Sequence, residues 1–365
     1  MQTLVSNFNI QKVLIAPLDW GLGHATRCIP IIKVLIASSF EVVIATEGKQ
    51  FILLQNEFPD LKFLPLKGYG IVYSKYKKLL PLKILLQLPK MLSAMKYEHN
   101  WLDKIIDENQ IDLVISDNRY GLYSKKVPCI FMTHQLTIKA PYNWLEKMMQ
   151  ASNYKYINRF TACWVPDVEE EQNIAGILSH PSSKPLVPLN YIGLLSRFNK
   201  QPVVGKKYDC CILLSGPEPQ RSVLEENILK DIDKVDRKVL LVRGKPGAKE
   251  RLSVPSNVEI SNHLAGNDMQ QAIMQSEYII SRSGYTTVME LLHLQKKSIL
   301  IPTPGQTEQE YLGKRLMDQG WCYAVDQNGF DFMQALESAK GFNYIFPSFE
   351  SNPLQTLIPQ LIEKL

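Results

Sequence analysis

A histidine follows a glycine-containing loop close to the N-terminus. The run Asp19–Arg27 reads DWGLGHATR, and Gly21 and Gly23 permit a tight turn before a helical pattern begins. His24 therefore lies at the start of a predicted helix, whose N-terminus should lower the pKa of the imidazole and keep it neutral. A neutral imidazole with an unperturbed pKa of about 6.5 suits a general base at neutral pH. The alternative is a turn histidine that only caps or packs.

Two residues further along could join His24. Asp117 follows the strand-like run Ile111–Ser116 and is placed to orient an imidazole, or it is an ordinary turn aspartate after a strand. His134 follows the strand-like run Val127–Met132. For His134, contact with a second substrate and a structural loop position remain equally open.

A second group of polar residues lies in the C-terminal half. The segment Ser281–Glu290 (SRSGYTTVME) predicts a polar loop at a strand end and then a helix. Thr286 or Thr287 could cap this helix, and the N–H groups at a helix start attract phosphate. Glu290 lies about one turn further on, where its carboxylate could accept two hydrogen bonds from a ribose diol. The alternative is an ordinary capped helix with an acidic residue near its start.

The loop Leu214–Arg221 (LSGPEPQR) has a related composition. Ser215 and Gly216 allow the backbone to approach a phosphate closely, and a helix is expected to begin near Gln220. Arg221 could pair with a pyrophosphate through its planar guanidinium. Because the loop contains a single glycine, a simple tight turn is the alternative.

Short apolar runs and helical patterns alternate around these residues, which predicts βαβ units and parallel sheets. The pattern starts again in the second half, so we expect an α/β protein with two Rossmann-like domains facing each other across a cleft. Ligands of such sheets bind beyond the carboxyl ends of the strands. The runs expected as strands begin at Lys12, Glu41, Ile111, Val127, Asp209, Lys238, Glu277 and Ser298.

The expected domains are residues 1–190 and 191–345, followed by a C-terminal helix within 346–365 that could cross back to the first domain. The proline-rich stretch Lys184–Val203 (KPLVPLNYIGLLSRFNKQPV) resembles an interdomain linker.

Composition narrows the class of protein. The chain has 365 residues, of which 45% are hydrophobic and 21% charged, and this excludes a largely disordered protein. The net charge of +5 is small for this length and argues against a nucleic-acid partner. It leaves room for an anionic ligand or an anionic membrane surface.

The cysteines and the N-terminus bear on the compartment. The six cysteines form no CxxC pair, so we expect buried, reduced thiols and no metal site. The N-terminal residues do not resemble a signal peptide, and no apolar run reaches the length of a membrane span. A cytoplasmic protein is expected.

The segment Arg282–Tyr311 resembles the donor-binding segment of GT-B glycosyltransferases, in particular the MurG-like group of lipid-intermediate N-acetylglucosaminyltransferases. It carries their pattern R-S-G-x-x-T-x-x-E, followed by an apolar strand that ends in Pro. A short segment ending in Tyr311 then corresponds to the Q-Q-Y of the family. The resemblance implies a UDP-sugar donor and a hexosyltransferase that needs no cofactor. The donor-binding residues that it implies are Ser215, Gly216, Arg221, Leu264, Arg282, Ser283, Gly284, Thr286, Thr287, Glu290, Gln309 and Glu310.

Two departures from that pattern leave the donor sugar open, because Glu310 replaces the second Gln of the family and Gly313 replaces its Asn. The N-terminal motif also differs: the MurG-like form is absent, and the run around His24 resembles the G-x-G-H-x-x-R-C of nucleotide-sugar hydrolases. The resemblance places acceptor contacts at Gly21, Gly23, Arg27 and His134.

The segment Tyr73–Tyr97 interleaves six lysines with leucine, isoleucine and methionine, and it contains no acidic residue. Such a basic amphipathic segment could lie on an anionic bilayer, which would make the protein peripheral on the inner membrane face. The alternative is a helix pair over the acceptor site with solvated lysines.

The sequence predicts an inverting, metal-independent glycosyltransferase that moves a sugar from a UDP-sugar to a hydroxyl of a lipid-linked or small-molecule glycan precursor, as in cell-envelope glycan biosynthesis. In this hypothesis His24, oriented by Asp117, removes the proton of the acceptor. One alternative is a nucleotide-sugar hydrolase in which His24 activates water. Another is a catalytically silent nucleotide-sugar-binding protein.

Overall fold

A computed structural model describes residues 10–70, 80–139, 143–200, 205–245, 247–250, 252–264, 266–349 and 353–365. The chain divides into two compact units. Unit 1 comprises residues 1–72, 84–197 and 349–365, and unit 2 comprises residues 73–83 and 198–348.

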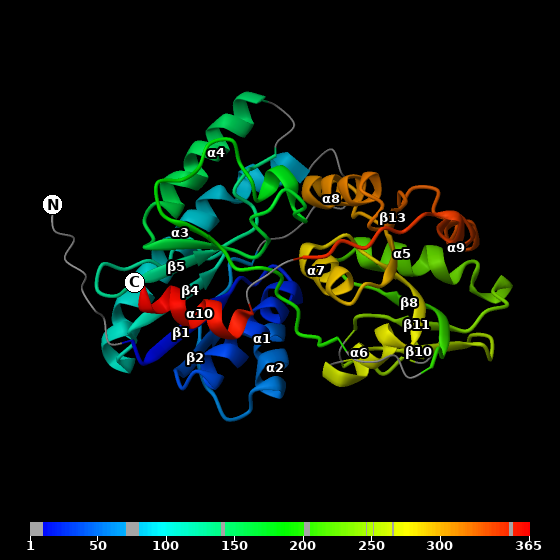
Figure 1. The fold of residues 1–365 in the computed structure, drawn as a ribbon, viewed down its shortest axis with the longest axis horizontal. Coiled ribbons are helices and arrows are strands. Elements are labelled where there is room, and N and C mark those ends of the chain that lie inside the picture. The colour runs from blue at the N-terminus through cyan, green and yellow to red at the C-terminus, as the bar shows by residue number, and fades with distance from the viewer. Residues whose placement is uncertain are drawn as a thin grey trace. The chain divides into compact units, whose positions relative to one another are not determined.

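Unit 1 is built on a seven-stranded parallel sheet with the order β3-β2-β1-β4-β5-β6-β7 (Figure 1). The central strands carry continuous apolar runs, such as Val13–Ala16 of β1, because helices cover both faces of such a sheet. The strands are β1 (Lys12–Pro17), β2 (Glu41–Thr46), β3 (Lys62–Pro65), β4 (Leu113–Asp117), β5 (Cys129–Met132), β6 (Ala162–Val165) and β7 (Leu189–Tyr191). The helices are α1 (Leu22–Ala37), α2 (Gly48–Glu57), α3 (Leu80–Asn109, in this unit from Ile84), α4 (Asn143–Ile157) and α10 (Leu354–Glu363), with a 3-10 turn η2 (Gly176–Leu178).

Unit 2 has a six-stranded parallel sheet with the order β10-β9-β8-β11-β12-β13. Its strands are β8 (Tyr208–Leu213), β9 (Val239–Val242), β10 (Val258–Ser261), β11 (Ser276–Ser281), β12 (Lys297–Leu300) and β13 (Tyr323–Ala324). Its helices are α5 (Gln220–Leu229), α6 (Gly266–Met274), α7 (Tyr285–His293), α8 (Thr307–Asp318) and α9 (Phe332–Gly341), with a 3-10 turn η3 (Ile232–Lys234).

The predicted fold class, two Rossmann-like units with parallel sheets, is confirmed. Each sheet starts at a central strand, adds two neighbours on one side and then continues on the other, which is the doubly wound order of dinucleotide-binding folds. The reversal lies between β1 and β4 in unit 1 and between β8 and β11 in unit 2. Crevices for ligands form at this reversal, beyond the carboxyl ends of the strands.

The C-terminal helix α10 belongs to unit 1 and packs against α1, as Figure 1 shows. Ile358 and Ile362, one turn apart on α10, are its buried residues. The expected linker Lys184–Val203 needs correction, because Leu189–Tyr191 form the edge strand β7 of unit 1.

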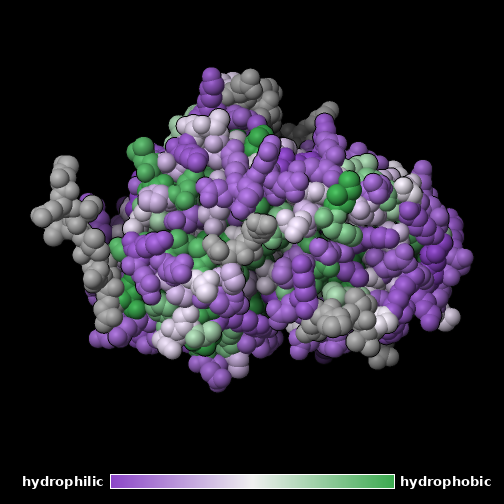
Figure 2. All heavy atoms as spheres, viewed as in Figure 1, coloured by the Kyte–Doolittle hydropathy of each residue, from purple (hydrophilic) through white to green (hydrophobic). Residues whose placement is uncertain are grey.

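All six cysteines are buried and unpaired with one another, as the sequence predicts. Within the described residues, no helix is both long and apolar enough to cross a membrane. In Figure 2 hydrophilic residues cover much of the face in view, with apolar residues in small groups among them. On α4, Trp144 and Met148 are more than half exposed, at 67% and 53%.

Candidate active site

Three strand ends of unit 1 lie level with one another at the reversal of strand order. Pro17 at the end of β1 pairs in register with Asp117 at the end of β4, and Asp117 is level with Met132 at the end of β5. Residues just beyond these three positions therefore converge at one edge of the sheet. His24, Asp117 and His134, which the sequence selected separately, all belong to this edge.

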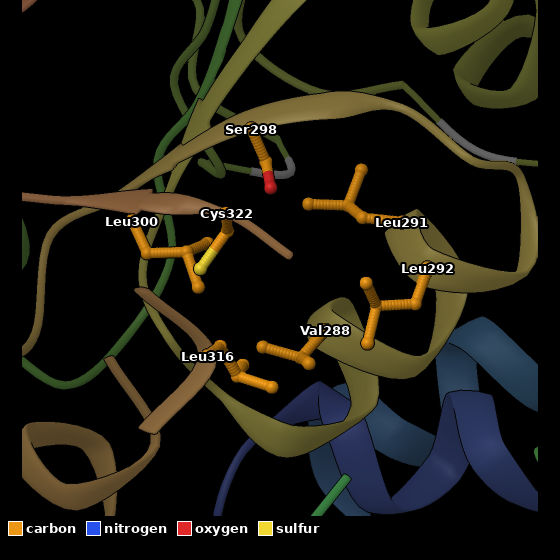
Figure 3. A pocket seen from close by; sticks show the side chains of 7 residues that line it. All are labelled: Val288, Leu291, Leu292, Ser298, Leu300, Leu316 and Cys322. Atoms are coloured by element: carbon orange, nitrogen blue, oxygen red, sulfur yellow. The ribbon is translucent and has the colours of Figure 1, made fainter. Parts of the chain in front are cut away.

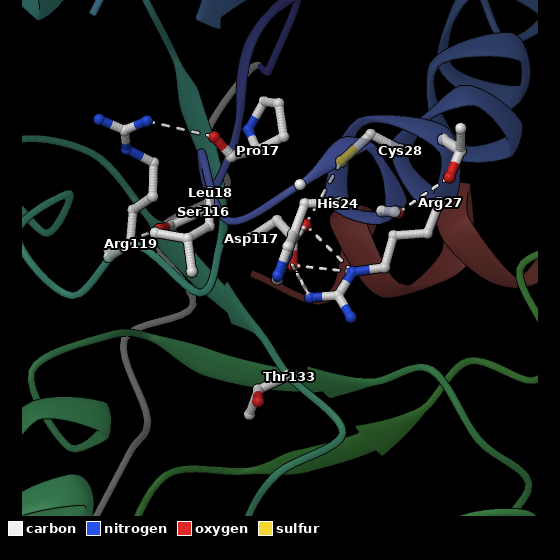
Figure 4. A network of polar contacts seen from close by, with 12 residues as sticks. Pro17, Leu18, His24, Arg27, Cys28, Ser116, Asp117, Arg119 and Thr133 are labelled. Carbon is white, nitrogen blue, oxygen red and sulfur yellow. Dashed lines mark hydrogen bonds and ion pairs between the residues drawn. The ribbon is translucent and has the colours of Figure 1, made fainter. Parts of the chain in front are cut away.

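The β1–α1 loop delivers His24 to this edge. Gly21 is the N-cap of α1 and has φ of 102°, a value that favours glycine. His24 is the third residue of the helix, and Arg27 and Cys28 follow it by three and four positions, so all three share one face. Figure 4 shows these side chains extending from α1 toward Asp117.

The Asp117 carboxylate is the centre of a buried polar cluster. His24 Nδ1 lies 2.9 Å from Asp117 Oδ2, and Arg27 Nε donates to both carboxylate oxygens at 3.0 Å. The Nη2 group of Arg27 also contacts Asp117 Oδ1. Cys28 Sγ lies 3.9 Å from Asp117 Oδ2, and Arg27 Nη1 lies 3.2 Å from His134 Nδ1. The cluster thus joins α1, β4 and the loop after β5.

The charges within this cluster set the protonation of its members. Burial lowers the pKa of His24, and the nearby Arg27 cation lowers it further, against the opposing effect of Asp117. Burial alone would raise the pKa of Asp117, but Arg27 and His24 outweigh it and hold the pKa below its usual value. His24 is therefore a neutral imidazole beside a carboxylate that stays ionised.

The contact with Asp117 also selects the tautomer of His24. An ionised carboxylate only accepts hydrogen bonds, so in the tautomer that bonds to Asp117 Oδ2 the ring proton is on Nδ1. Arg27 Nη2, a donor 3.0 Å from the same nitrogen, makes no hydrogen bond to it in that tautomer. The Nε2 atom then carries the lone pair. Because the His24 side chain keeps 16% exposure while Asp117 has none, this ring nitrogen can serve as a base for a substrate.

Arg27 and His134 have positions that differ from those expected of acceptor contacts. Arg27 is 2% exposed and its guanidinium is engaged with Asp117, His24 and His134, so its interactions are with the protein. His134 is 4% exposed and lies against Arg27. We therefore reassign Arg27 as a residue that positions Asp117 and His24.

Two residues that the sequence analysis missed hold the β1–α1 loop. Gln50 on α2 donates from Nε2 to the carbonyl of Gly21 at 2.8 Å and also contacts the carbonyl of Leu18. Asp19 accepts hydrogen bonds from the backbone N–H groups of Tyr69 (3.0 Å) and Gly70 (3.1 Å). The loop is thus fixed on both sides of Trp20, just before His24. Gln50 belongs to no recognisable motif, and Asp19 opens the run Asp19–Arg27 but was given no role there.

A second buried ion pair lies beneath this loop. Arg119 Nε donates to Glu98 Oε1 at 2.8 Å, and both side chains are at most 1% exposed. Arg119 also donates to the carbonyls of Pro17 and Lys67, while Tyr69 donates to Glu98. These bonds join the ends of β1 and β4 to α3 and to the loop after β3, and so they stiffen the edge that carries Asp117.

The second group of predicted residues lies where the strand order of unit 2 reverses, between β8 and β11. Leu213, Ser281 and Leu300 are level at the ends of β8, β11 and β12. Ser215 and Gly216 lie exposed in the loop after β8, and Gly216 has φ of 100°. The loops that were predicted separately from 214–221 and 281–290 therefore begin side by side.

Arg282 is a buried cation at the centre of this edge. It is 2% exposed, and its guanidinium donates to the carbonyls of Ile301 (3.2 Å) and Gln220 (2.7 Å) and to Gln327 Oε1 (2.5 Å). All these partners are neutral, and no carboxylate pairs with Arg282 in the described part of the chain. Burial lowers the pKa of Arg282 to about 10, so the group still carries its positive charge at neutral pH.

The start of α7 differs from the expected capped helix. Gly284, which has no side chain, is the N-cap, so neither Thr286 nor Thr287 is the cap. Both threonines lie in the first turn of α7 and are half-buried. Ser283 is fully buried and its hydroxyl donates to the carbonyl of Gln309 at 2.8 Å. Glu290 is buried in the second turn.

Gln309 and Glu310 fold back onto the loop between β12 and α8. Gln309 Oε1 accepts from the N–H of Thr303 at 2.9 Å, and Glu310 Oε1 accepts from the N–H of Gly305 at 2.9 Å. Leu264, the expected backbone contact of the base, lies half-buried before α6. Contact of these three residues with a donor remains a prediction.

Arg221, which the sequence analysis expected to pair with a pyrophosphate, is engaged within its own unit, and its contact with a donor remains a prediction. Its guanidinium donates to Glu218 at 2.6 Å, to Glu225 at 3.2 Å and to the carbonyl of Arg243 at 3.1 Å. The side chain is 4% exposed, so this cation is already compensated by carboxylates within the unit. Arg282, with its neutral partners, is the better candidate for the charge that meets a phosphate.

An apolar gap lies between α7 and β12. Figure 3 shows its walls, on which the Ser298 hydroxyl is the only polar group among those drawn. The gap is too narrow to hold a water molecule, so it is part of the packing that anchors α7. The lining residues are Val288, Leu291, Leu292, Ser298, Leu300, Leu316 and Cys322.

Residues 220–339 match the model of the glycosyltransferase family 28 C-terminal domain. Unit 2 contains a glycosyltransferase family 28 C-terminal domain. The resemblance of Arg282–Tyr311 to the MurG-like group is thereby confirmed, because this segment lies inside the family 28 domain. The matched residues also include Arg282 and the uncapped start of α7.

Two curated relatives agree with this family. Over 76 residues the chain is 34% identical to the UDP-N-acetylglucosamine--N-acetylmuramyl-(pentapeptide) pyrophosphoryl-undecaprenol N-acetylglucosamine transferase of Caldicellulosiruptor saccharolyticus, and this covers 20% of each chain. The chain thus matches only about a fifth of the length of that transferase. An uncharacterized glycosyltransferase of Methanosarcina acetivorans is 23% identical over 334 residues, which cover 85% of this chain and 82% of that one.

The whole chain superposes on a solved glycosyltransferase structure, that of the glycotransferase of kitacinnamycin. The TM-score is 0.64, with 98% of this chain and 93% of that chain covered. At 12% identity this likeness shows the fold alone, which is GT-B. The family 28 match thus lies in unit 2, and the fold of the chain is GT-B.

Proposed function

We propose that the protein transfers a sugar from a UDP-sugar to a hydroxyl group of an acceptor, with inversion at the anomeric carbon. Unit 2 binds the nucleotide, and unit 1 supplies the base. The choice of UDP is supported by the family 28 domain and by the named donor of the Caldicellulosiruptor saccharolyticus relative, which is UDP-N-acetylglucosamine.

The observation that carries this proposal is the buried Arg282 in unit 2. A buried charge is costly unless an opposite charge compensates it, and the partners of Arg282 are all neutral. The start of α7 two residues later has no side-chain cap, and helix starts attract phosphate. A diphosphate bound here would meet both, and as a leaving group it would be stabilised by them.

In the proposed reaction the acceptor oxygen attacks the anomeric carbon of the donor sugar. His24 Nε2 takes the proton of the acceptor hydroxyl, while Asp117 holds Nδ1–H and stabilises the imidazolium that forms. The bond from the anomeric carbon to the diphosphate breaks, and UDP leaves with the electron pair. A single displacement inverts the anomeric centre. We propose that Arg282 and α7 supply the charge stabilisation without a metal ion.

Hydrolysis of a nucleotide-sugar is the second candidate function. It is favoured by the residues that build the unit 1 cluster, because Arg27 and Cys28, which follow His24 in the hydrolase-like motif, both contact Asp117. In that reaction Nε2 of His24 would take a proton from water. The steps in unit 2 would be unchanged.

Release of UDP from UDP-N-acetylglucosamine and other UDP-sugars, with and without added acceptors, separates these functions. We expect release that depends on a polyprenyl-linked or soluble sugar acceptor and that persists in EDTA. Release at the same rate without acceptor would support hydrolysis. Binding of UDP without turnover of any donor would leave only a nucleotide-binding role, and loss of turnover in EDTA would contradict metal independence.

The pH dependence of turnover reports the state of His24. The base must be neutral, so kcat/KM falls as pH falls through the pKa of His24. Because burial and Arg27 lower that pKa below its ordinary value of 6.5, the acid limb is expected to have its midpoint below pH 6.5. Replacing Arg27 with Gln removes the cation and leaves Asp117, so the midpoint should move to higher pH. An unmoved limb in R27Q would show that another group titrates.

We propose a lipid-linked or small-molecule glycan acceptor and a protein that works in the cytoplasm, with the lysine-rich segment 73–97 contacting anionic lipid. Residues 73–79 lie outside the described residues, and residues 80–97 form the first part of α3. Membrane contact through this segment therefore remains a prediction.

A further inference from the structure

Thr303 carries a buried hydroxyl group in the middle of the unit 2 site. The residue lies in the loop after β12 and is 2% exposed. Its Oγ1 atom has no hydrogen-bond partner within the part of the chain that the structure describes. Its backbone, in contrast, is satisfied, since the N–H donates to Gln309 Oε1 at 2.9 Å and the carbonyl accepts from the N–H of Gln306 at 3.0 Å.

The hydroxyl faces the glycine loop after β8. A Cβ atom placed on Gly216 would come within 3.9 Å of Thr303 Oγ1. Because β8 and β12 flank β11 and the three strands end level, Gly216, Gly284 and Thr303 each lie three residues past a strand end. The Thr303 hydroxyl therefore belongs to the same layer of the site as the uncapped start of α7.

The cationic group of the site lies directly behind this hydroxyl. Arg282 Nη1 donates to the carbonyls of Ile301 and Pro302, the two residues before Thr303, at 3.2 and 3.4 Å. Arg282 Nε is also buried without a partner among the described residues. A positive charge and an unsatisfied hydroxyl donor thus belong to the same strand ends, and this combination fits an anionic oxygen.

The unpartnered hydroxyl lowers the stability of the folded protein, and a bound ligand that accepts its hydrogen bond would remove this loss. A buried polar group without a partner destabilises the folded protein, and valine has the same shape without the polar group. We propose that the Thr303 hydroxyl donates a hydrogen bond to a diphosphate oxygen of the nucleotide donor, close to Gly216. This inference rests on the proposed function, and it adds a donor-binding residue that the sequence analysis did not select.

Thr303→Val tests the inference through two measurements, UDP affinity and thermal stability. If the hydroxyl were merely structural, its loss would not weaken UDP binding while leaving thermal stability intact. Loss of a hydrogen bond to a charged oxygen should weaken UDP binding about tenfold or more in calorimetric titration. The thermal stability of the protein without UDP should stay the same or rise, since the substitution removes an unsatisfied group. Thr303→Ser keeps the hydroxyl and should bind UDP nearly as the wild type does.

Ser276→Ala is the matched control in the same unit. Ser276 lies at the start of β11, at the opposite edge of the sheet, and its buried hydroxyl donates to the carbonyl of Ala272 at 2.6 Å. Removing it should lower thermal stability and leave UDP affinity unchanged. Titration with uridine should show no effect of Thr303→Val, while inorganic pyrophosphate should show the same weakening as UDP.

The outcomes distinguish the two proposals. If the wild type binds UDP and the T303V variant binds it with equal affinity, the role of Thr303 is overturned and the proposed donor site is retained. Equal weakening for uridine and UDP also overturns it, because the loss would then come from a distorted site. Wild-type protein that binds neither UDP nor pyrophosphate overturns both the donor site and the role of Thr303.

Discussion

Replacing His24 with alanine is expected to lower the rate of sugar transfer by about 10²- to 10⁴-fold, the usual contribution of a general base. The variant loses the Nε2 atom that accepts the proton of the acceptor, while the Asp117–Arg27 pair stays in place. Affinity for UDP should be unchanged, because the proposed nucleotide site is built from residues of unit 2. Steady-state kinetics and UDP titration of the same preparation measure both quantities.

His99→Ala is a suitable control for the histidine substitution. His99 lies on α3 in the same unit, where its Nδ1 contacts the carbonyl of Tyr123 at 2.9 Å and its ring stacks on that of Tyr123. It should keep full turnover. If His24→Ala keeps full turnover as well, His24 has no part in the chemistry, and the base must be sought elsewhere.

Replacing Asp117 with asparagine is expected to have the largest effect on stability, a loss of about 3–5 kcal/mol in the free energy of unfolding. The side chain is fully buried and compensates the buried Arg27 cation. Without the carboxylate, Arg27 becomes an uncompensated charge, and Nδ1 of His24 loses its acceptor. Turnover should therefore fall together with stability. Urea denaturation at pH 7 measures the stability change.

A double variant separates the two effects of Asp117. In D117N/R27M the unpaired charge is also removed, so a large part of the lost stability should return, whereas turnover should stay low because His24 is still not oriented. Additive losses of stability in the double variant would contradict the pairing. The pKa of Asp117 is held below its usual 3.8, so the stabilisation by the carboxylate is present above pH 3.8 and lost as pH falls below it. D117N should lack that acid-dependent loss.

The central strands of both sheets could be predicted from the sequence, because β1, β4 and β11 each contain a run of apolar residues and end in Pro, Asp or Ser. The edge strands β3, β7, β10 and β13 were missed, and so was the buried interior strand β6. Strand β7 has three half-buried residues and β13 has two, so neither shows an apolar run. The proline-rich surroundings of β7 favoured a linker instead, although an edge strand tolerates them.

The part of the candidate site that could be predicted consists of single residues with a recognisable chemistry that follow the ends of strands. His24 and Asp117 could be paired because both follow strands that meet at the reversal of order. The internal partners of Arg27 and Arg221 could not be predicted, since burial and pairing depend on packing between elements. Gln50 lies in no motif, and its role follows only from the carbonyls that its side chain reaches.

The C-terminal helix has a consequence for the order in which the protein is made. Unit 1 is interrupted, since residues 198–348 form most of unit 2 and residues 349–365 return to unit 1. Helix α10 packs on α1, the helix that carries His24, through Ile358 and Ile362. Although N-terminal domains usually fold first during synthesis, here the ribosome completes unit 2 before the last helix of unit 1 exists. Unit 1, whose synthesis begins before that of most of unit 2, is therefore completed after unit 2.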